Sequence, residues 1–296
     1  MTDAFFKLHP AVNFIFFAFV LALSMFIMNP ICLALSLVCA FVNAVYLNGL
    51  RTIKLCLKFI LPMVLLIVLI NPVFNHQGVT ILTYFPWDNP LTLESIVYGI
   101  ASAALLSSVV LWFSVFNSVM TSDKIVYLFG KIIPSLSLVL SMSLRFVPKF
   151  SAQLKNVRNA QRCIGRDVCD GSAVSRMKNG IRIISIMLSW SMENAIETAD
   201  SMKSRGFGLK GRTAYSIYKF DRRDLVMLII VALLGVSVSV SAIMGVIDFT
   251  YYPSIKGSLT DVPSLIVFFL YGILMLIPTI LNIGEGIKWK RLRSVI

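Results

Sequence analysis

Long apolar runs, broken by short polar segments, dominate both ends of the chain. A membrane-spanning helix needs about 20 apolar residues, because it rises about 1.5 Å per residue across a hydrocarbon core of about 30 Å. Breaks at Asn29-Pro30, Asn71-Pro72 and Asn89-Pro90 mark ends of runs, since proline cannot donate a backbone N–H. The pattern predicts six transmembrane helices, over residues 11–28, 31–47, 57–74, 94–119, 225–247 and 262–283.

Segment 120–224 has helical periodicity without the continuous apolarity of a span. Residues 135–162 place apolar side chains at helical spacing, which predicts a helix that Pro148 is expected to kink. A second pattern predicts a helix of about 25 residues that ends at Gly206 and carries one apolar stripe. The stripe consists of Ile181, Ile184, Leu188, Met192, Ala195, Ala199 and Met202.

The apolar stripe must be covered by something. We expect it to pack on the helix over 135–162 and on the base of the spans, with part of it available to a partner subunit. Residues 166–180, between the two helices, are rich in Asp, Gly and Ser and predict a turn-rich connection. The two helices are therefore expected to form a hairpin or a crossed pair at the membrane surface.

Composition excludes a soluble globular domain. Apolar residues make up 57% of the 296 positions, charged residues 14%, and the mean hydropathy is +0.84. Lys and Arg number 27 against 14 Asp and Glu. Such an excess suits anionic lipid, an acidic protein partner or nucleic acid, and composition does not choose among them.

The placement of the cations predicts the orientation. Segment 120–224 carries 18 of them and residues 48–58 carry three, whereas residues 75–93 carry none and residues 248–261 carry one. Because cationic loops stay in the cytoplasm during insertion, both termini and segment 120–224 are expected there, in a multi-pass protein of the cell membrane. The predicted fold is an all-α membrane protein, with four spans in 1–119, a basic cytoplasmic region in 120–224, and two spans with a basic tail in 225–296.

Catalytic and metal-binding patterns are weak. The five cysteines lack metal-ligand spacing, and the two histidines, His9 and His76, fall on opposite sides of the predicted membrane. Asp167 and Asp170-Gly171 partly match the start of the motif of membrane CDP-alcohol phosphotransferases, but the Ala-Arg pair and the further aspartates are missing. A glycine-rich loop followed by Lys-Ser/Thr is also missing. We expect no metal, no cofactor, no bound nucleotide and no enzymatic activity.

Three short motifs in segment 120–224 carry a family resemblance. The first helix contains Ser143-Leu144-Arg145-Phe146-Val147-Pro148 and ends in Arg162-Cys163-Ile164-Gly165-Arg166, and the second ends in Ser204-Arg205-Gly206. With these motifs in this order after an apolar half, the chain resembles the transmembrane T component of energy-coupling factor transporters, the family of the cobalt-transport permease subunit. The family's first small-Arg-Gly motif is altered here, because Ile164 stands where the arginine is expected.

The resemblance implies a coupling scaffold without catalysis of its own. Two long coupling helices would dock two ABC-type ATPases and transmit their closure to a small substrate-binding membrane subunit that takes up a vitamin or a metal ion; nucleic acid is not among the implied partners. Arg205 suits docking because its planar fork can hold a carboxylate bidentately, and Gly206 suits a helix end because it accepts positive φ. The alternatives are a self-contained permease or channel and, less favoured, a membrane-bound enzyme. Ion-coupled transport by the chain alone is disfavoured, because the spans hold almost no charged side chain near their centres.

Overall fold

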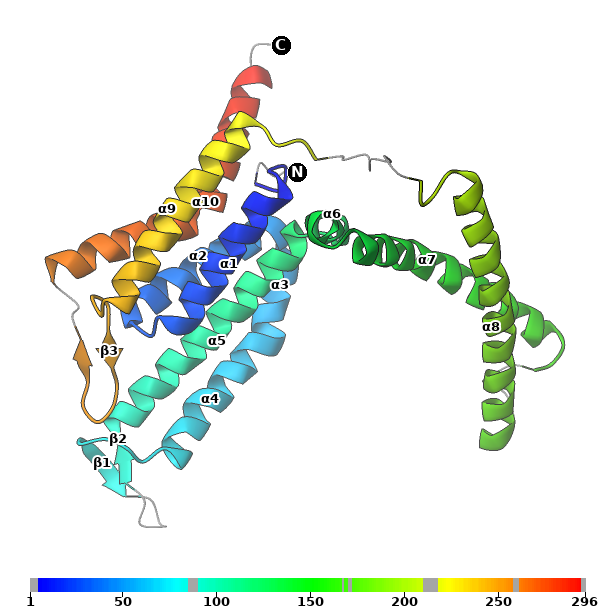
Figure 1. The fold of residues 1–296 in the computed structure, drawn as a ribbon. Coiled ribbons are helices and arrows are strands. Elements are labelled where there is room, and N and C mark those ends of the chain that lie inside the picture. The colour runs from blue at the N-terminus through cyan, green and yellow to red at the C-terminus, as the bar shows by residue number, and fades with distance from the viewer. Residues whose placement is uncertain are drawn as a thin grey trace. The chain divides into compact units, whose positions relative to one another are not determined.

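The computed structural model describes residues 5–84, 90–166, 168–169, 172–209, 218–257 and 261–293. Most of these residues are helical and the strands are few and short, so the predicted all-α fold is confirmed (Figure 1). The chain forms two compact units: unit 1 comprises Met1–Ile125 with Tyr218–Ile296, and unit 2 comprises Val126–Ile217.

Unit 1 contains the predicted spans. Among the described residues, five helices are long and apolar enough to cross a membrane, and the sixth apolar helix, α1, has 17 residues, at the lower limit for a span. The helix Leu50–Phe74 is made of three consecutive parts, the middle one π-helical. The elements of unit 1 are α1 (Pro10–Phe26), α2 (Pro30–Asn48), α3 (Leu50–Leu55), η1 (Cys56–Ile60), α4 (Leu61–Phe74), α5 (Leu93–Val119), α9 (Arg222–Ile243) and α10 (Val262–Arg293).

Local sequence explains how several of these helices start and stop. His9 and Asn29 each accept a backbone N–H two residues on, and proline follows each of them at the first helical position, where no N–H is needed. Pro72, predicted to mark an end, lies inside α4, two residues before Phe74. Two short antiparallel hairpins join spans: β1 (Ile81–Tyr84) with β2 (Pro90–Thr92), and β3 (Phe249–Thr250) with β4 (Lys256–Gly257).

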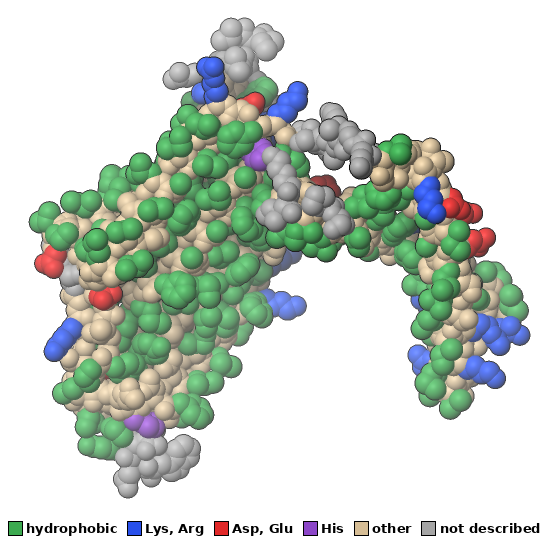
Figure 2. All heavy atoms as spheres, viewed as in Figure 1, with side chains coloured by type: hydrophobic (Ala, Val, Ile, Leu, Met, Phe, Trp, Pro, Cys, Tyr) green, Lys and Arg blue, Asp and Glu red, His purple; other side chains and the backbone are tan. Residues whose placement is uncertain are grey.

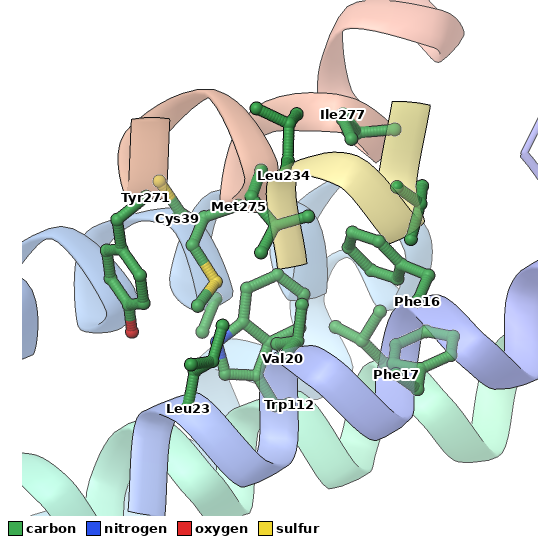
Figure 3. Close-up of a cluster of buried hydrophobic side chains, with 14 of the residues drawn as sticks. Phe16, Phe17, Val20, Leu23, Cys39, Trp112, Leu234, Tyr271, Met275 and Ile277 are labelled. Carbon is green, nitrogen blue, oxygen red and sulfur yellow. The ribbon is translucent and has the colours of Figure 1, made fainter. Parts of the chain in front are cut away.

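The interior of unit 1 is packed with aromatic side chains (Figure 3). Phe16 meets Phe17 and Trp112 edge to face, with ring centroids 5.3 and 6.2 Å apart. Trp112 Nε1 donates to Ser36 Oγ at 3.1 Å, which satisfies a buried N–H where water is absent. The membrane-spanning part of the chain is therefore a tightly filled bundle.

The N-terminal segment closes one end of this bundle. Phe5 N donates to Asn282 Oδ1 and His9 N to Asp224 Oδ1, each at 3.2 Å. The ammonium of Lys124, which is 2% exposed, donates to the carbonyl of Phe6 and lies 3.9 Å from the centre of its ring. Burial lowers the pKa of Lys124 to about 8. The segment thus ties together the starts of α6 (Ser122–Ile132) and α9 and the second half of α10.

Unit 2 consists mainly of two long helices, α7 (Pro134–Cys163) and α8 (Ala173–Ser204), preceded by α6 (Ser122–Ile132), which begins in unit 1. The helix predicted over 135–162 is confirmed, and it continues through Pro148. The connection is shorter than predicted, because α8 begins at Ala173, where Ser172 Oγ accepts the N–H of Ser175. Residues Asp167 and Asp170-Gly171 of the phosphotransferase-like motif lie outside the described residues.

The predicted burial of the apolar stripe on α8 against α7 is wrong for most of the stripe. Ile181, Ile184, Leu188 and Met192 are 60–67% exposed, whereas Ile183 is 5% exposed. α8 meets α7 with a different face, on which Trp190 packs edge to face against Phe150, with ring centroids 5.3 Å apart. An aromatic pair buries more apolar surface per residue than the aliphatic side chains of the stripe, which accounts for the choice of face.

Candidate functional site

The end of α7 is a Schellman cap. Gly165 has φ +74°, its N–H donates to the carbonyl of Arg162 at 3.0 Å, and the N–H of Arg166 donates to the carbonyl of Gln161 at 3.0 Å. These two bonds satisfy carbonyls that the helix leaves open. Ile164 occupies the cap position between the helix and Gly165.

The end of α8 is built in the same way. Gly206 has φ +77°, its N–H donates to the carbonyl of Lys203 at 2.9 Å, and the N–H of Phe207 donates to the carbonyl of Met202 at 3.0 Å. Ser204 is the last helical residue, and its hydroxyl donates to the carbonyl of Ser201 at 2.9 Å. Arg205 therefore holds the position that Ile164 holds on α7.

The two ends differ in the side chain that each presents. The cap residues have nearly the same backbone, φ −92° and ψ 7° for Ile164 against φ −85° and ψ 11° for Arg205. Both side chains are exposed, Ile164 to 64%. Cys163 and the flanking Arg166 are exposed as well. The same cap conformation thus displays an aliphatic side chain at the end of α7 and a guanidinium at the end of α8.

A cleft of about 430 Å³ lies between α7 and α8 beside the Arg205 end. Charged side chains line much of it: Arg145, Lys149 and Arg205 are cations, and Glu197 is the one carboxylate. Lys149 Nζ on α7 donates to Asn194 Oδ1 on α8 at 2.5 Å and so links the two helices at the cleft. The excess of positive charge favours an acidic partner group. The full lining is Leu138, Met142, Arg145, Phe146, Lys149, Asn194, Glu197, Thr198, Ser201, Met202, Arg205 and Phe207.

The cleft brings together two of the three predicted motifs. Arg145 and Phe146 from the Ser-Leu-Arg-Phe segment lie with Arg205 in one lining. Ser143 bonds back to the carbonyl of Val139, and Leu144 is 39% exposed, so these residues of the segment serve the helix and its outer surface. Pro148, an exposed residue inside α7, does not line the cleft.

The altered motif at the end of α7 is apart from this cleft. Arg162, Cys163, Ile164, Gly165 and Arg166 are not among the lining residues. Ile164 lies nineteen positions after Arg145, which corresponds to about 28 Å along the helix axis. Unit 2 therefore offers two separate helix ends, with Arg145 belonging to the second.

Sequence reasoning missed part of the cleft. Lys149, Asn194, Glu197 and Phe207 line it and were not predicted. A signal was present, since Asn194, Glu197 and Ser201 follow spacings of three and four on α8 and form a polar line beside the apolar stripe. Which helix that line would face depends on the crossing with α7, and periodicity alone does not determine it.

Apolar side chains remain uncovered on unit 2 (Figure 2). On α8 they are the stripe residues Ile181, Ile184, Leu188 and Met192, joined by Ile196 at 65% exposure. On α7, Val139 is 59% and Val147 is 61% exposed. Soluble surfaces seldom expose so many aliphatic side chains together, and such patches mark contacts with protein or lipid.

The family comparison covers both helix ends. The sequence pattern of the cobalt transport protein family (CbiQ) matches residues 4–215. The energy-coupling factor transporter transmembrane protein EcfT of Lacticaseibacillus paracasei is 30% identical over 195 residues, covering 64% of this chain and 74% of that protein. EcfT 1 of Listeria monocytogenes is 26% identical over 207 residues, covering 64% and 76%. EcfT of Lactobacillus helveticus is 36% identical over 97 residues, so this chain spans 35% of that relative.

The resemblance inferred from the motifs of α7 and α8 is therefore confirmed. The match extends from the first span to beyond Arg205 and covers more than half of the chain. This protein belongs to the cobalt transport protein (CbiQ) family, whose relatives include the transmembrane proteins of energy-coupling factor transporters.

Proposed function

We propose that the chain is the energy-coupling membrane subunit of an importer in which two ABC-type ATPases dock on the ends of α7 and α8. The observation that carries the proposal is the pair of matching helix caps, each of which presents one exposed side chain beyond the last turn. Two ends of the same backbone geometry suit two related motor subunits. The different side chains, Ile164 and Arg205, suit two ATPases that are not identical.

The chemistry of the Arg205 end supports docking on an acidic groove. A guanidinium at a helix cap projects past the helix, where its N–H groups can hold a carboxylate through two parallel bonds. Arg145 and Lys149, in the same cleft, add positive charge that attracts the same partner. Gly206 keeps the cap compact, so that another backbone can approach.

The uncovered apolar stripe on α8 supports a contact with a small substrate-binding membrane subunit. That subunit would select the cargo, a vitamin or a metal ion. The aromatic packing inside unit 1 supports the same assignment of cargo binding to a separate subunit, because a tightly packed bundle suits a scaffold better than a channel for the cargo. The cations of residues 48–58 and 120–224, set against the cation-poor residues 75–93 and 248–261, support a cytoplasmic location for both termini and for unit 2.

Affinity purification of the full chain from native membrane tests the proposal. We expect two ABC-type ATPases and one small membrane protein to be recovered with it, and no uptake by the purified chain alone in liposomes. Transport by the chain alone would instead establish the self-contained permease. Metal-dependent turnover by the chain would establish the enzyme.

A further inference from the structure

A second cleft lies in unit 1, where the ends of α2 and α5 meet the start of α3. Its volume is about 520 Å³, inside the range of about 300–1,000 Å³ that is typical of small-ligand sites. Both polar and apolar side chains form its walls. The lining residues are Asn48, Arg51, Thr52, Leu55, Val110, Phe113, Ser114, Asn117 and Ser118.

Hydrogen bonds hold one wall of this cleft in place. Asn48 Nδ2 donates to Ser114 Oγ at 3.2 Å, and Ser118 Oγ donates to Asn48 Oδ1 at 2.7 Å. Thr52 Oγ1 donates to the carbonyl of Ala44 at 2.7 Å. These bonds join α2 to α5 and α3 to α2, so the wall is formed before a ligand arrives, and binding need not order it.

Two donors of the lining are not used by the protein itself. The side chains of Arg51 and Asn117 are exposed, and neither hydrogen-bonds to any residue that the structure describes. Arg51 also forms no ion pair within the described part of the chain. It carries the only charge among the nine lining residues. The cleft therefore favours an anion with several acceptor oxygens.

We propose that this cleft binds the phosphate of an anionic phospholipid headgroup. Arg51 would hold two phosphate oxygens with its planar fork, and the amide of Asn117 would donate to a third oxygen or to the headgroup hydroxyls. Lys54 and Lys58, one and two turns further along the same helix, raise the local positive potential, which favours an anionic lipid over a zwitterionic one.

The surroundings of the cleft favour a lipid over a soluble phosphate. Phe113, at 47% exposure, lines the cleft together with Leu55 and Val110. The helix Leu50–Phe74 is the least buried of the five long spans of the described chain, and Leu57 on it is 64% exposed. Acyl chains would run along this apolar surface while the headgroup stays among the polar side chains at the bundle end. The inference does not depend on the docking of ATPases.

Native mass spectrometry of the full chain in detergent tests the site. Phosphatidylglycerol and phosphatidylcholine with the same acyl chains would be added in equal amounts. We expect the chain to retain phosphatidylglycerol preferentially and Arg51→Gln to reduce this retention about tenfold, because a bidentate charge-assisted contact is lost. Lys54→Gln is the comparison variant: it removes the same charge from the same helix but lies outside the lining, so only its screened long-range contribution to the potential is lost, and we expect retention to fall by less than twofold.

Two further measurements test the amide contact and the source of the phosphate. Asn117→Leu keeps every charge and is expected to reduce retention by a smaller factor than Arg51→Gln. Millimolar inorganic phosphate is expected to leave the bound lipid in place. Equal losses in Arg51→Gln and Lys54→Gln, equal retention of the two lipids, or displacement by inorganic phosphate would each overturn the proposal.

Discussion

The ends of α7 and α8 have almost the same backbone and differ in what they present. Each closes with a glycine at positive φ and the same pair of N–H to carbonyl bonds. Ile164 at the first end is aliphatic and does not line the cleft between α7 and α8, whereas Arg205 at the second end lies in that cleft with Arg145 and Lys149. The comparison separates two roles, because the cap geometry sets where a side chain projects and the side chain sets which partner groove accepts it.

The largest effect is expected at Arg205. Arg205→Ala would cost about 2–5 kcal/mol of docking free energy, because it leaves a partner carboxylate buried without its cation. Arg205→Lys would recover only part of this, since lysine keeps the charge and loses the fork. Quantitative recovery of each ATPase with the tagged chain measures the loss. Lys203→Ala, which removes a nearby cation outside the lining, is the control. Unchanged recovery and unchanged uptake for Arg205→Ala would contradict the docking role.

Ile164 tests whether the first end docks through apolar contact. We expect Ile164→Ala to weaken binding of one ATPase by up to about 1.5–3 kcal/mol, the worth of burying one aliphatic side chain, and to leave the other ATPase bound. Ile164→Val would cost less. Binding of each purified ATPase to the chain in nanodiscs measures the two losses separately. An equal loss for both ATPases would show that the two ends do not act independently.

The two glycines test the shared backbone. Alanine at positive φ costs roughly 1–2 kcal/mol, so Gly165→Ala and Gly206→Ala are expected to loosen the last turn of their helices by similar amounts. Gly206→Ala is expected to cost slightly more, because a new Cβ there would lie 3.1 Å from Leu209 Cδ1, while nothing lies within 4 Å at Gly165. Hydrogen exchange of the last helical turns measures both. A large effect at one end alone would mean that the caps differ in solution.

The smallest effect is expected at the cations beside Ile164. Arg166→Gln removes an exposed charge that attracts the partner before the two surfaces touch. It is therefore expected to slow association and to cost less than about 1 kcal/mol of binding free energy. The difference from wild type would shrink as salt is raised, because screening shortens the range of the interaction. Association rates at two ionic strengths measure this. A salt-independent loss would instead place Arg166 inside the docking contact.

Sequence reasoning predicted the elements better than the faces they present. The spans follow from local hydropathy, and the end of α8 follows from Gly206; both signals depend only on residues close together in the sequence. The face of α8 that meets α7 was predicted wrongly, because Trp190 finds Phe150 across the helix crossing, and no period within α8 contains that information. The polar cleft between α7 and α8 depends on the same crossing of the two helices and was not predicted for the same reason.

The sequence by itself therefore determined that this chain is a helical membrane protein with two long capped helices and one altered motif. It did so because hydrophobicity, proline and glycine act within a few residues of their own position. Only the tertiary structure decided that Arg145 joins Arg205, that Ile164 stands apart from them, and that Arg51 lines a cleft of its own. Those groupings depend on contacts between residues far apart along the chain, which packing alone selects.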